Sequence, residues 1–309
     1  MVTSSTFDSM LERSFAPPSP GRVKVALPIG LVAISFASIL IKICDAPPLV
    51  IAAYRLSLAT LILMLFALPR TLREVRRLGR REILLSLMAG VFLCFHFAFW
   101  ITSLKYTSVA SSVIFVTTNP IFVALASSFL FHERLSAALI ISIFVAVFGG
   151  IIIGGGDWHK GLESLYGDLL ALLGAIMVTG YFLAGRRVRQ KMGLLSYITL
   201  VYGVAAVLLV FLSLINGHTF FNYSSRTYLL FLLLALFPQL VGHTTLNWAL
   251  KFFSATLVTV FILGEPIGAT ILAYLLLKEP LNSSLLWGGT LVLLGIYLSA
   301  REERKLGRI

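Results

Sequence analysis

The sequence predicts an all-α integral membrane protein of ten transmembrane helices, arranged as two inverted repeats of five helices. Three observations predict this fold class: a very apolar composition, a series of long apolar runs, and a segment that recurs at a fixed offset. Of the 309 residues, 58% are hydrophobic and 12% are charged, and the mean hydropathy is +0.95. A soluble domain is about 45–50% apolar and about 25% charged, so lipid is the expected solvent.

The apolar runs are each close to the ~20 residues that a helix needs to cross a bilayer. In chain order the ten runs cover residues 25–43, 49–68, 83–104, 107–131, 135–153, 166–185, 194–214, 228–250, 255–277 and 285–300. The last run is short, and we expect it to take in residues 282–284. Residues 1–24 are polar and proline-rich, which predicts a disordered cytoplasmic tail without the apolar core of a cleaved signal peptide. Residues 301–309 are predicted to form a basic cytoplasmic tail.

Lysine and arginine are distributed unevenly between the two predicted sides of the membrane. Nineteen of the 25 basic residues, Arg134 among them, fall on the side of the N-terminus, five fall on the other side, Lys160 among them, and Arg55 lies within a span. Basic loops stay in the cytoplasm, so we expect a multi-pass protein of the cell (inner) membrane with both termini cytoplasmic. The net charge of +12 then reflects topology, and we expect no nucleic-acid partner.

A segment of the first half recurs in the second half at an offset of 146 residues. Lys, Pro and Glu are rare in apolar segments, and one of each recurs. The pairs are Lys105 with Lys251, Pro120 with Pro266, Glu133 with Glu279, and Gly149 with Gly295. Five spans in each half, residues 25–155 and 156–300, would force the second copy to enter the membrane upside down. Inverted repeats of this kind build many secondary transporters, whose substrate site lies near the midplane between the repeats.

Residues 101–136 and 246–282 carry a resemblance to a known family. Each has a Leu-Lys-Tyr/Phe approach to a span, a mid-span proline, and a Glu followed by Arg or Pro and then Leu at its end. These regions resemble the two signature regions of the EamA family in the drug/metabolite transporter (DMT) superfamily, and Arg55 in the second span resembles the family's arginine there. The resemblance covers residues 25–300 and implies a ten-span transporter of amino acids, nucleosides, cofactors or other metabolites. Many members of the family export, and some exchange.

Two polar residues precede the repeated prolines near the predicted midplane. Glu265 lies about eleven residues into the ninth span, which is near mid-depth at ~1.5 Å per residue. A polar group at that depth is costly and therefore indicates function; Glu265 could carry a proton or bind a cationic group, or it could be a protonated packing residue. Its counterpart is Asn119, so carboxylate chemistry would be one-sided. Pro120 and Pro266 each remove a backbone donor, which favours either a binding cavity or a packing kink.

Further candidate substrate-binding residues occur at helical spacing. Gln239, His243 and Asn247 follow one face of the eighth span, where they could line a wet pathway or join helices. His96 and Trp100 lie one turn apart in the third span, and could form a cavity wall or pack in the core. Tyr181 could line the cavity or anchor the interface.

Arg55 could snorkel to the outer interface, clamp a carboxylate, or pair with an acidic side chain. Glu133 and Glu279 end the fourth and ninth spans, where we expect structural roles such as pairing with loop arginines.

The leading functional prediction is a secondary transporter, exporter or exchanger, of a small organic metabolite such as an amino acid, nucleoside or related cofactor. Two five-span bundles would rock about a midplane cavity lined by spans one, three, four, six, eight and nine. A proton or a counter-substrate could couple transport, and the chain could act as a monomer or a homodimer. The alternatives are a membrane enzyme acting on a lipid intermediate and a scaffold that transports nothing.

No phosphate-binding glycine-rich loop and no HExxH motif is present in the sequence. The two cysteines, Cys44 and Cys94, lack the spacing of a disulfide framework or a metal site. We therefore expect no cofactor, no metal and no enzymatic activity.

Overall fold

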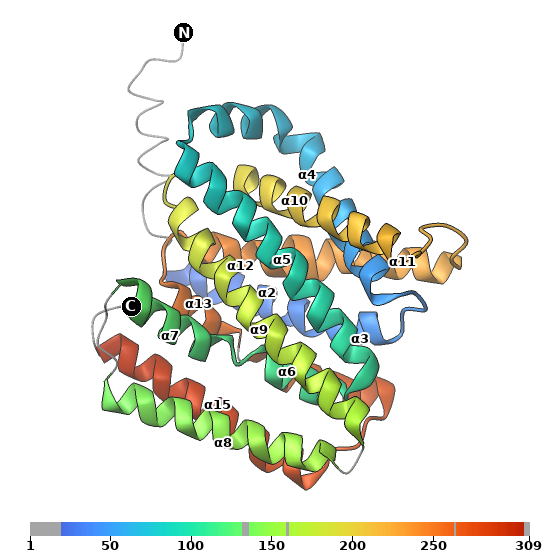
Figure 1. Ribbon diagram of the computed structural model, residues 1–309. Helices are drawn as coiled ribbons and strands as arrows, with labels where there is room; N and C mark the ends of the chain where they lie inside the picture. The colour runs from blue at the N-terminus through green and yellow to red at the C-terminus, as the bar shows by residue number, and fades with distance from the viewer. Residues whose placement is uncertain (1–19, 132–135, 159–160, 263, 306–309) are drawn as a thin grey trace.

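The computed structural model describes residues 20–131, 136–158, 161–262 and 264–305 (Figure 1). Throughout these residues the chain forms helices joined by short links, with no strand among them. Most of the predicted N-terminal tail, together with Glu133, Arg134 and Lys160, lies outside the described residues.

The helices follow one another in two runs. In the first half they are α2 (Pro20–Ser35), α3 (Ala37–Lys42), α4 (Pro48–Arg77), α5 (Arg80–Tyr106), α6 (Val109–Val116), α7 (Asn119–Phe131) and α8 (Ala137–Trp158). In the second half they are α9 (Leu162–Val188), α10 (Leu194–Ile215), α11 (Ser225–Leu234), the π-helix η1 (Ala235–His243), α12 (Thr244–Ala249), α13 (Ala255–Phe261), α14 (Gly264–Leu272), the π-helix η2 (Ala273–Leu277) and α15 (Ser283–Lys305).

Six helical stretches of the described chain are long and apolar enough to cross a membrane. They are Val25–Lys42, Pro48–Arg77, Arg80–Tyr106, Leu162–Val188, Leu194–Ile215 and Ser225–Ala249. Four shorter apolar stretches complete the series: Val109–Val123, Ile140–Gly149, Gly264–Leu277 and Ser283–Gly295. The all-helical, multi-pass membrane fold is therefore confirmed, and the count of ten spans stays a prediction.

The predicted tails and the arginine-rich segment 69–82, between the second and third apolar runs, are more helical than expected. Helix α2 begins at Pro20, inside the predicted tail, because a proline in the first turn needs no backbone N–H partner. Helix α4 continues to Arg77 and α5 begins at Arg80, so the segment predicted as a loop is a helical extension with a two-residue link. Leu, Arg and Glu are good helix formers. Helix α15 likewise runs on to Lys305 through most of the predicted basic tail.

Four predicted spans are interrupted rather than continuous. The fourth is divided into α6 and α7, and the ninth into α13, α14 and η2. The first is divided at Phe36 into α2 and α3, and the eighth contains the π-helix η1 around Pro238. Prolines lack the N–H that would continue an α-helix. Interrupted backbone at membrane depth is tolerated where it is buried in protein or lines a cavity.

The most extensive helix pairings join one element of the first half to one of the second. Helix α5 packs along α9, α4 along α10, and α8 along α15, while α2 contacts η1 and α7 contacts α13. Figure 1 shows α8 and α15 side by side at one edge of the molecule and α4 crossed by α10 at the opposite edge. The interrupted helices α6, α7, α13 and α14 lie between these pairs and meet at the interface between the two halves.

Candidate substrate site

A small pocket lies where the interrupted helices meet; we call it the central pocket. Helices α2, α5, α9 and α12, the π-helix η1, and the α6–α7 and α13–α14 breaks contribute to its wall. The lining residues are Ile34, His96, Trp100, Val116, Thr117, Asn119, Val178, Phe182, His243, Leu246, Ile262 and Glu265. Its volume is about 30 Å³, which is room for about two waters. A metabolite would enter only after the surrounding helices move apart.

The break in the fourth span presents Asn119 to this pocket. The hydroxyl groups of Thr117 and Thr118 turn back onto carbonyls of α6, at 2.8 Å from Val113 O and 2.6 Å from Phe115 O. Asn119 then begins α7, and Pro120 follows in its first turn. The proline therefore begins a new helix instead of kinking a continuous one. Asn119 is buried, and its Oδ1 makes no hydrogen bond with any described residue.

The ninth span has the equivalent arrangement. Glu265 and Pro266 lie in the first turn of α14, and the Glu265 N–H donates to Ile262 O at 2.8 Å. The Glu265 side chain is 5% exposed and lines the central pocket. A carboxylate in the first helical turn is favoured by the helix dipole. Among the described residues, no hydrogen bond or ion pair engages this carboxyl group.

Arg55 is the largest fully buried side chain, with no exposed surface. Its Nε donates to Gln239 Oε1 at 2.8 Å, and its Cζ lies 4.2 Å above the centre of the Phe97 ring. The guanidinium group therefore does not snorkel to the outer interface. Its Nη1 and Nη2 atoms find no hydrogen-bond partner in the described part of the chain. Glu265 is near enough to interact with it electrostatically, although the two form no ion pair.

His96, Trp100 and His243 form one wall of the central pocket. The His96 and Trp100 rings stack at a centroid distance of 6.0 Å, and His243 lies 6.4 Å from His96. His96 Nδ1 lies 2.9 Å from the Gly174 carbonyl. Because a carbonyl only accepts, Nδ1 carries the proton, and Nε2 of the neutral ring is the acceptor. His243 also packs edge-on against Phe97, the ring that lies under Arg55.

Asn247 and Tyr181 lie behind the pocket and hold helices together. The Tyr181 hydroxyl donates to Asn247 Oδ1 at 2.8 Å, and Asn247 Nδ2 donates to the Tyr202 hydroxyl at 3.2 Å. Tyr181 is fully buried, so it is no interface anchor. Of the polar stripe in the eighth span, only His243 lines the pocket; Gln239 and Asn247 join helices in this structure.

Sequence reasoning missed several residues that support this site. Tyr202 belongs to α10, the seventh span, which was not expected to contribute. Phe97 lies under Arg55, and Pro238 lies within the π-helix beside Gln239. Of these three residues, Pro238 could have been identified from the sequence, because a proline inside an apolar run indicates an irregular helix. A tyrosine in an apolar span gives no comparable signal.

Glu279 has a partner different from the expected arginine. Its carboxylate accepts the Val109 N–H, at the start of α6, at 2.9 Å. A carboxylate at a helix N-terminus satisfies an otherwise unpaired donor. The expectation of a structural role agrees with this contact, and its repeat partner Glu133 lies outside the described residues.

Comparison with known proteins decides the family. The model of the EamA-like transporter family matches residues 25–155 and again residues 165–301. The chain belongs to the EamA-like transporter family. It is 27% identical to the uncharacterized transporter YdfC of Bacillus subtilis over 289 residues, which cover 92% of each chain. It is also 23% identical to an uncharacterized transporter of Archaeoglobus fulgidus over 291 residues, covering 91% of this chain and 99% of the other.

This EamA-like transporter also resembles a solved crystal structure. The two superimpose with a TM-score of 0.67 at 19% sequence identity, covering 92% of this chain and 99% of the other. At this identity the likeness shows the fold alone. The family and its named relatives identify a multi-pass membrane transporter and name no substrate.

Proposed function

We propose that this EamA-like protein is a secondary transporter, an exporter or exchanger, of a small organic metabolite such as an amino acid, nucleoside or related cofactor. The observation that carries the proposal is the pair of interrupted helices at repeat-equivalent positions, with Asn119 and Glu265 at the breaks and both facing the central pocket. Interrupted helices in matching positions of two halves are typical of transporter binding sites.

An inverted repeat of two five-span halves is part of this proposal, and the helix pairing supports it. With the predicted spans numbered in chain order, the α5–α9 pairing joins spans three and six, and the α2–η1 pairing joins spans one and eight. Exchanging the two halves converts one of these pairings into the other. The α4–α10, α13–α7 and α8–α15 pairings each convert into themselves. A twofold relation between the halves predicts this pattern.

Two helix caps obey the same relation. Lys42 Nζ, at the end of α3, donates to the carbonyl oxygens of Leu104 and Thr107 at 2.6 and 3.1 Å. Arg186, near the end of α9, donates to Leu250 and Lys251 at 2.8 and 3.0 Å. Leu104 and Leu250 are repeat partners. Each half thus places a basic side chain on the C-terminal carbonyls of its third span, where a cation is favoured.

Transport requires that the halves separate, because the central pocket is too small for a metabolite. Rocking of one repeat against the other around a fixed midplane site would open it alternately to the two sides. One end of the molecule carries the basic segments 70–81 and 186–191, and we call it the basic end. We propose that the basic end faces the cytoplasm, in accord with the positive-inside rule.

Replacement of Glu265 tests the proposed function directly. We expect Glu265→Gln and Glu265→Ala to lower transport at least tenfold, because the amide and the methyl group can neither carry a proton nor balance a substrate cation. Uptake of candidate amino acids and nucleosides into proteoliposomes, with and without a pH gradient, is the measurement.

Glu163→Gln is the matched control, since Glu163 is exposed in the first turn of α9, away from the pocket. It should transport like the wild type. Transport by both Glu265 variants at wild-type rates at every pH would remove Glu265 from the mechanism.

A further inference from the structure

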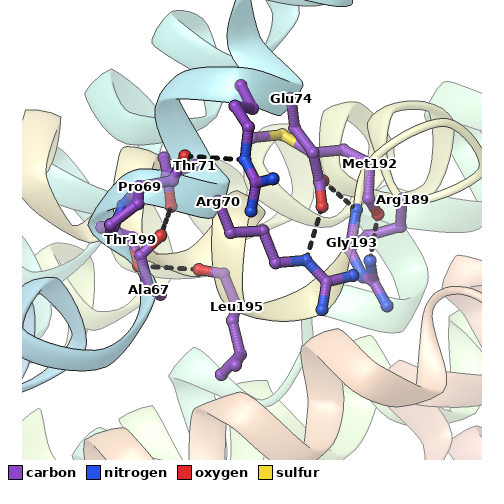
Figure 2. A network of polar contacts seen from close by, with 11 residues as sticks. Ala67, Pro69, Arg70, Thr71, Glu74, Arg189, Met192, Gly193, Leu195 and Thr199 are labelled. Carbon is purple, nitrogen blue, oxygen red and sulfur yellow. Dashed lines mark hydrogen bonds and ion pairs between the residues drawn. The ribbon is translucent and has the colours of Figure 1, made fainter. Parts of the chain in front are cut away.

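A second and larger cavity opens at the basic end; we call it the basic-end pocket. Its volume is about 600 Å³. Its wall comes from the end of α4, the link from α4 to α5, the link from α9 to α10, and the chain around α12. Figure 2 shows part of this wall, with Arg70 and Glu74 of α4 opposite Arg189, Met192 and Gly193.

Basic side chains outnumber acidic ones in this wall. The five basic residues are Arg70, Arg77, Arg189, Lys191 and Lys251, and the two acidic residues are Glu74 and Glu82. Both carboxylates are already engaged. Glu74 accepts from Arg70 Nε and from the Gly193 N–H, each at 2.7 Å, and Glu82 accepts from Lys191. Each carboxylate thus already has a basic partner in the wall, Arg70 for Glu74 and Lys191 for Glu82.

Arg189 keeps its positive charge in the pocket. It is 2% exposed, and its hydrogen bonds go to the backbone carbonyls of Asn247 and Met192. These carbonyl groups accept from its Nε and Nη1 atoms without neutralising the guanidinium. Arg77 is exposed in the same wall and has no carboxylate within ion-pair distance among the described residues.

Lys251 lies among the charged side chains of this pocket. Its pKa is lowered by burial and by the nearby guanidinium groups of Arg189 and Arg70, which together outweigh the opposing effect of Glu74. Like charges gathered in a recess disfavour one another, and an anion held among them would relieve that cost. Arginine is well suited to hold carboxylate and phosphate groups.

The wall also has an apolar part next to its charges. Trp248 and Phe252 line the pocket and pack edge to face at 5.6 Å. Basic residues that only orient the protein in the membrane can lie on a solvated loop and need no aromatic wall beside them. A recess that combines surplus positive charge with an aromatic wall is instead suited to an organic anion.

The two pockets share a helix. Within α12, Leu246 lines the central pocket and Trp248 lines the basic-end pocket. Between them lies Asn247, whose side chain contacts Tyr181 and whose carbonyl is bound by Arg189. The two pockets are thus each lined by a residue of α12 directly next to Asn247.

We propose that the basic-end pocket is an anion-binding site that holds the carboxylate or phosphate group of the substrate before the substrate reaches the central pocket. This inference rests on the proposed transport function. Arg77, Arg189 and Lys251 supply the charge, and Trp248 and Phe252 cover the apolar part of the ligand. Movement of α12 around Asn247 would then admit the substrate to the central pocket.

Inorganic phosphate is the probe for this site. The full-length protein in phosphatidylcholine nanodiscs is titrated with phosphate at constant ionic strength, and tryptophan fluorescence is recorded. We expect a saturable change that is absent in Trp248→Phe, because Trp248 lines the pocket. In R77Q/K251Q the midpoint should rise at least tenfold. In R76Q/R80Q, which loses the same charge from exposed positions outside the pocket, it should stay within twofold of the wild type.

Three results would overturn the proposal. They are no saturable response in the wild type, a response that survives in Trp248→Phe, and an equal loss in R77Q/K251Q and R76Q/R80Q, which would indicate only a general surface field. The titration is repeated in nanodiscs containing phosphatidylglycerol. A response suppressed there would assign the pocket to a lipid headgroup and overturn the substrate role.

The outcome is separable from that of the proposed function. Phosphate binding is measured without transport, so Glu265→Gln should bind phosphate like the wild type. If the Glu265 variants transport normally, the proposed central site fails whatever the titration shows. If they do not, and phosphate fails to bind, only the anion site fails.

Discussion

At the scale of single residues, the unusual feature is a fully buried guanidinium group without an ion-pair partner in the described chain. Arg55 is held by Gln239 at its Nε and by the Phe97 ring below it. A buried charge is costly unless it is hydrogen-bonded and balanced. Within the described residues, only the Nε atom of Arg55 is hydrogen-bonded. Its charge must be balanced by Glu265, by a ligand, or by both.

Removal of the Gln239 amide should therefore destabilise the protein. Gln239→Leu leaves the Arg55 Nε buried and unbonded, and the expected loss is about 1–3 kcal/mol of unfolding free energy. The thermal unfolding midpoint of the purified protein is the measurement. The double variant Arg55→Met/Gln239→Leu is the control, because removing both partners removes the unpaired donor. If that double variant is less stable than Gln239→Leu, the interpretation of an unpaired buried donor is wrong.

At the scale of the elements, glycines set the close approach of α8 and α15. A Cβ atom on Gly149 would come within 2.5 Å of the Gly288 carbonyl, and one on Gly295 within 2.5 Å of the Ser142 carbonyl. Both neighbours are backbone atoms of the opposite helix, which cannot turn aside. The two glycines occupy equivalent positions at the offset of 146 residues. Gly149 of α8 lies against α15 and Gly295 of α15 lies against α8, so the contact is reciprocal.

Substitution of either glycine should separate these helices. We expect Gly149→Leu and Gly295→Leu to lower the unfolding midpoint by similar amounts, because they disturb equivalent contacts of one interface. Gly289→Leu is a gentler comparison on α15, since the nearest atom to its Cβ is a side-chain carbon of Ile114 at 3.4 Å. A large loss for one repeat partner with none for the other would contradict the reciprocal contact.

At the scale of the whole molecule, the most extensive helix pairings join the two halves, and the main buried core is built from both of them. The buried cluster around the central pocket contains residues of both, from Ile34 in α2 to Ala273 in η2. Movement between the halves must therefore exchange one set of packed contacts for another. This is consistent with rocking about a shared interface.

The proposed orientation gives a prediction that needs no substrate. In a background of Cys44→Ala and Cys94→Ala, Asn216→Cys lies past the end of α10 and Arg76→Cys at the basic end. A membrane-impermeant maleimide should label the first in intact cells and the second only after the membrane is broken, because basic segments stay in the cytoplasm. Labelling of the Arg76 position in intact cells would reverse the proposed orientation.

The sequence alone determined the class of fold, the family, and the places where polar groups enter the membrane. Apolar runs identify helices in lipid because an unpaired backbone group is costly there. Repeated Lys, Pro and Glu residues predicted an internal duplication, because such residues are rare in spans. The same logic selected Asn119 and Glu265 as candidates for the pocket wall, and it left open whether Arg55 reaches the outer interface or pairs within the protein.

Only the tertiary structure decided which polar residues meet, and where helices break. Gln239, His243 and Asn247 share one pattern in the sequence, yet one lines the central pocket and two join helices. Tyr202 and Phe97 could not be recognised from the sequence pattern, because their roles depend on Asn247 and Arg55, which lie far from them along the chain. A helical pattern fixes the direction of a side chain about its own axis, whereas its partner is fixed by the packing of other helices against that face.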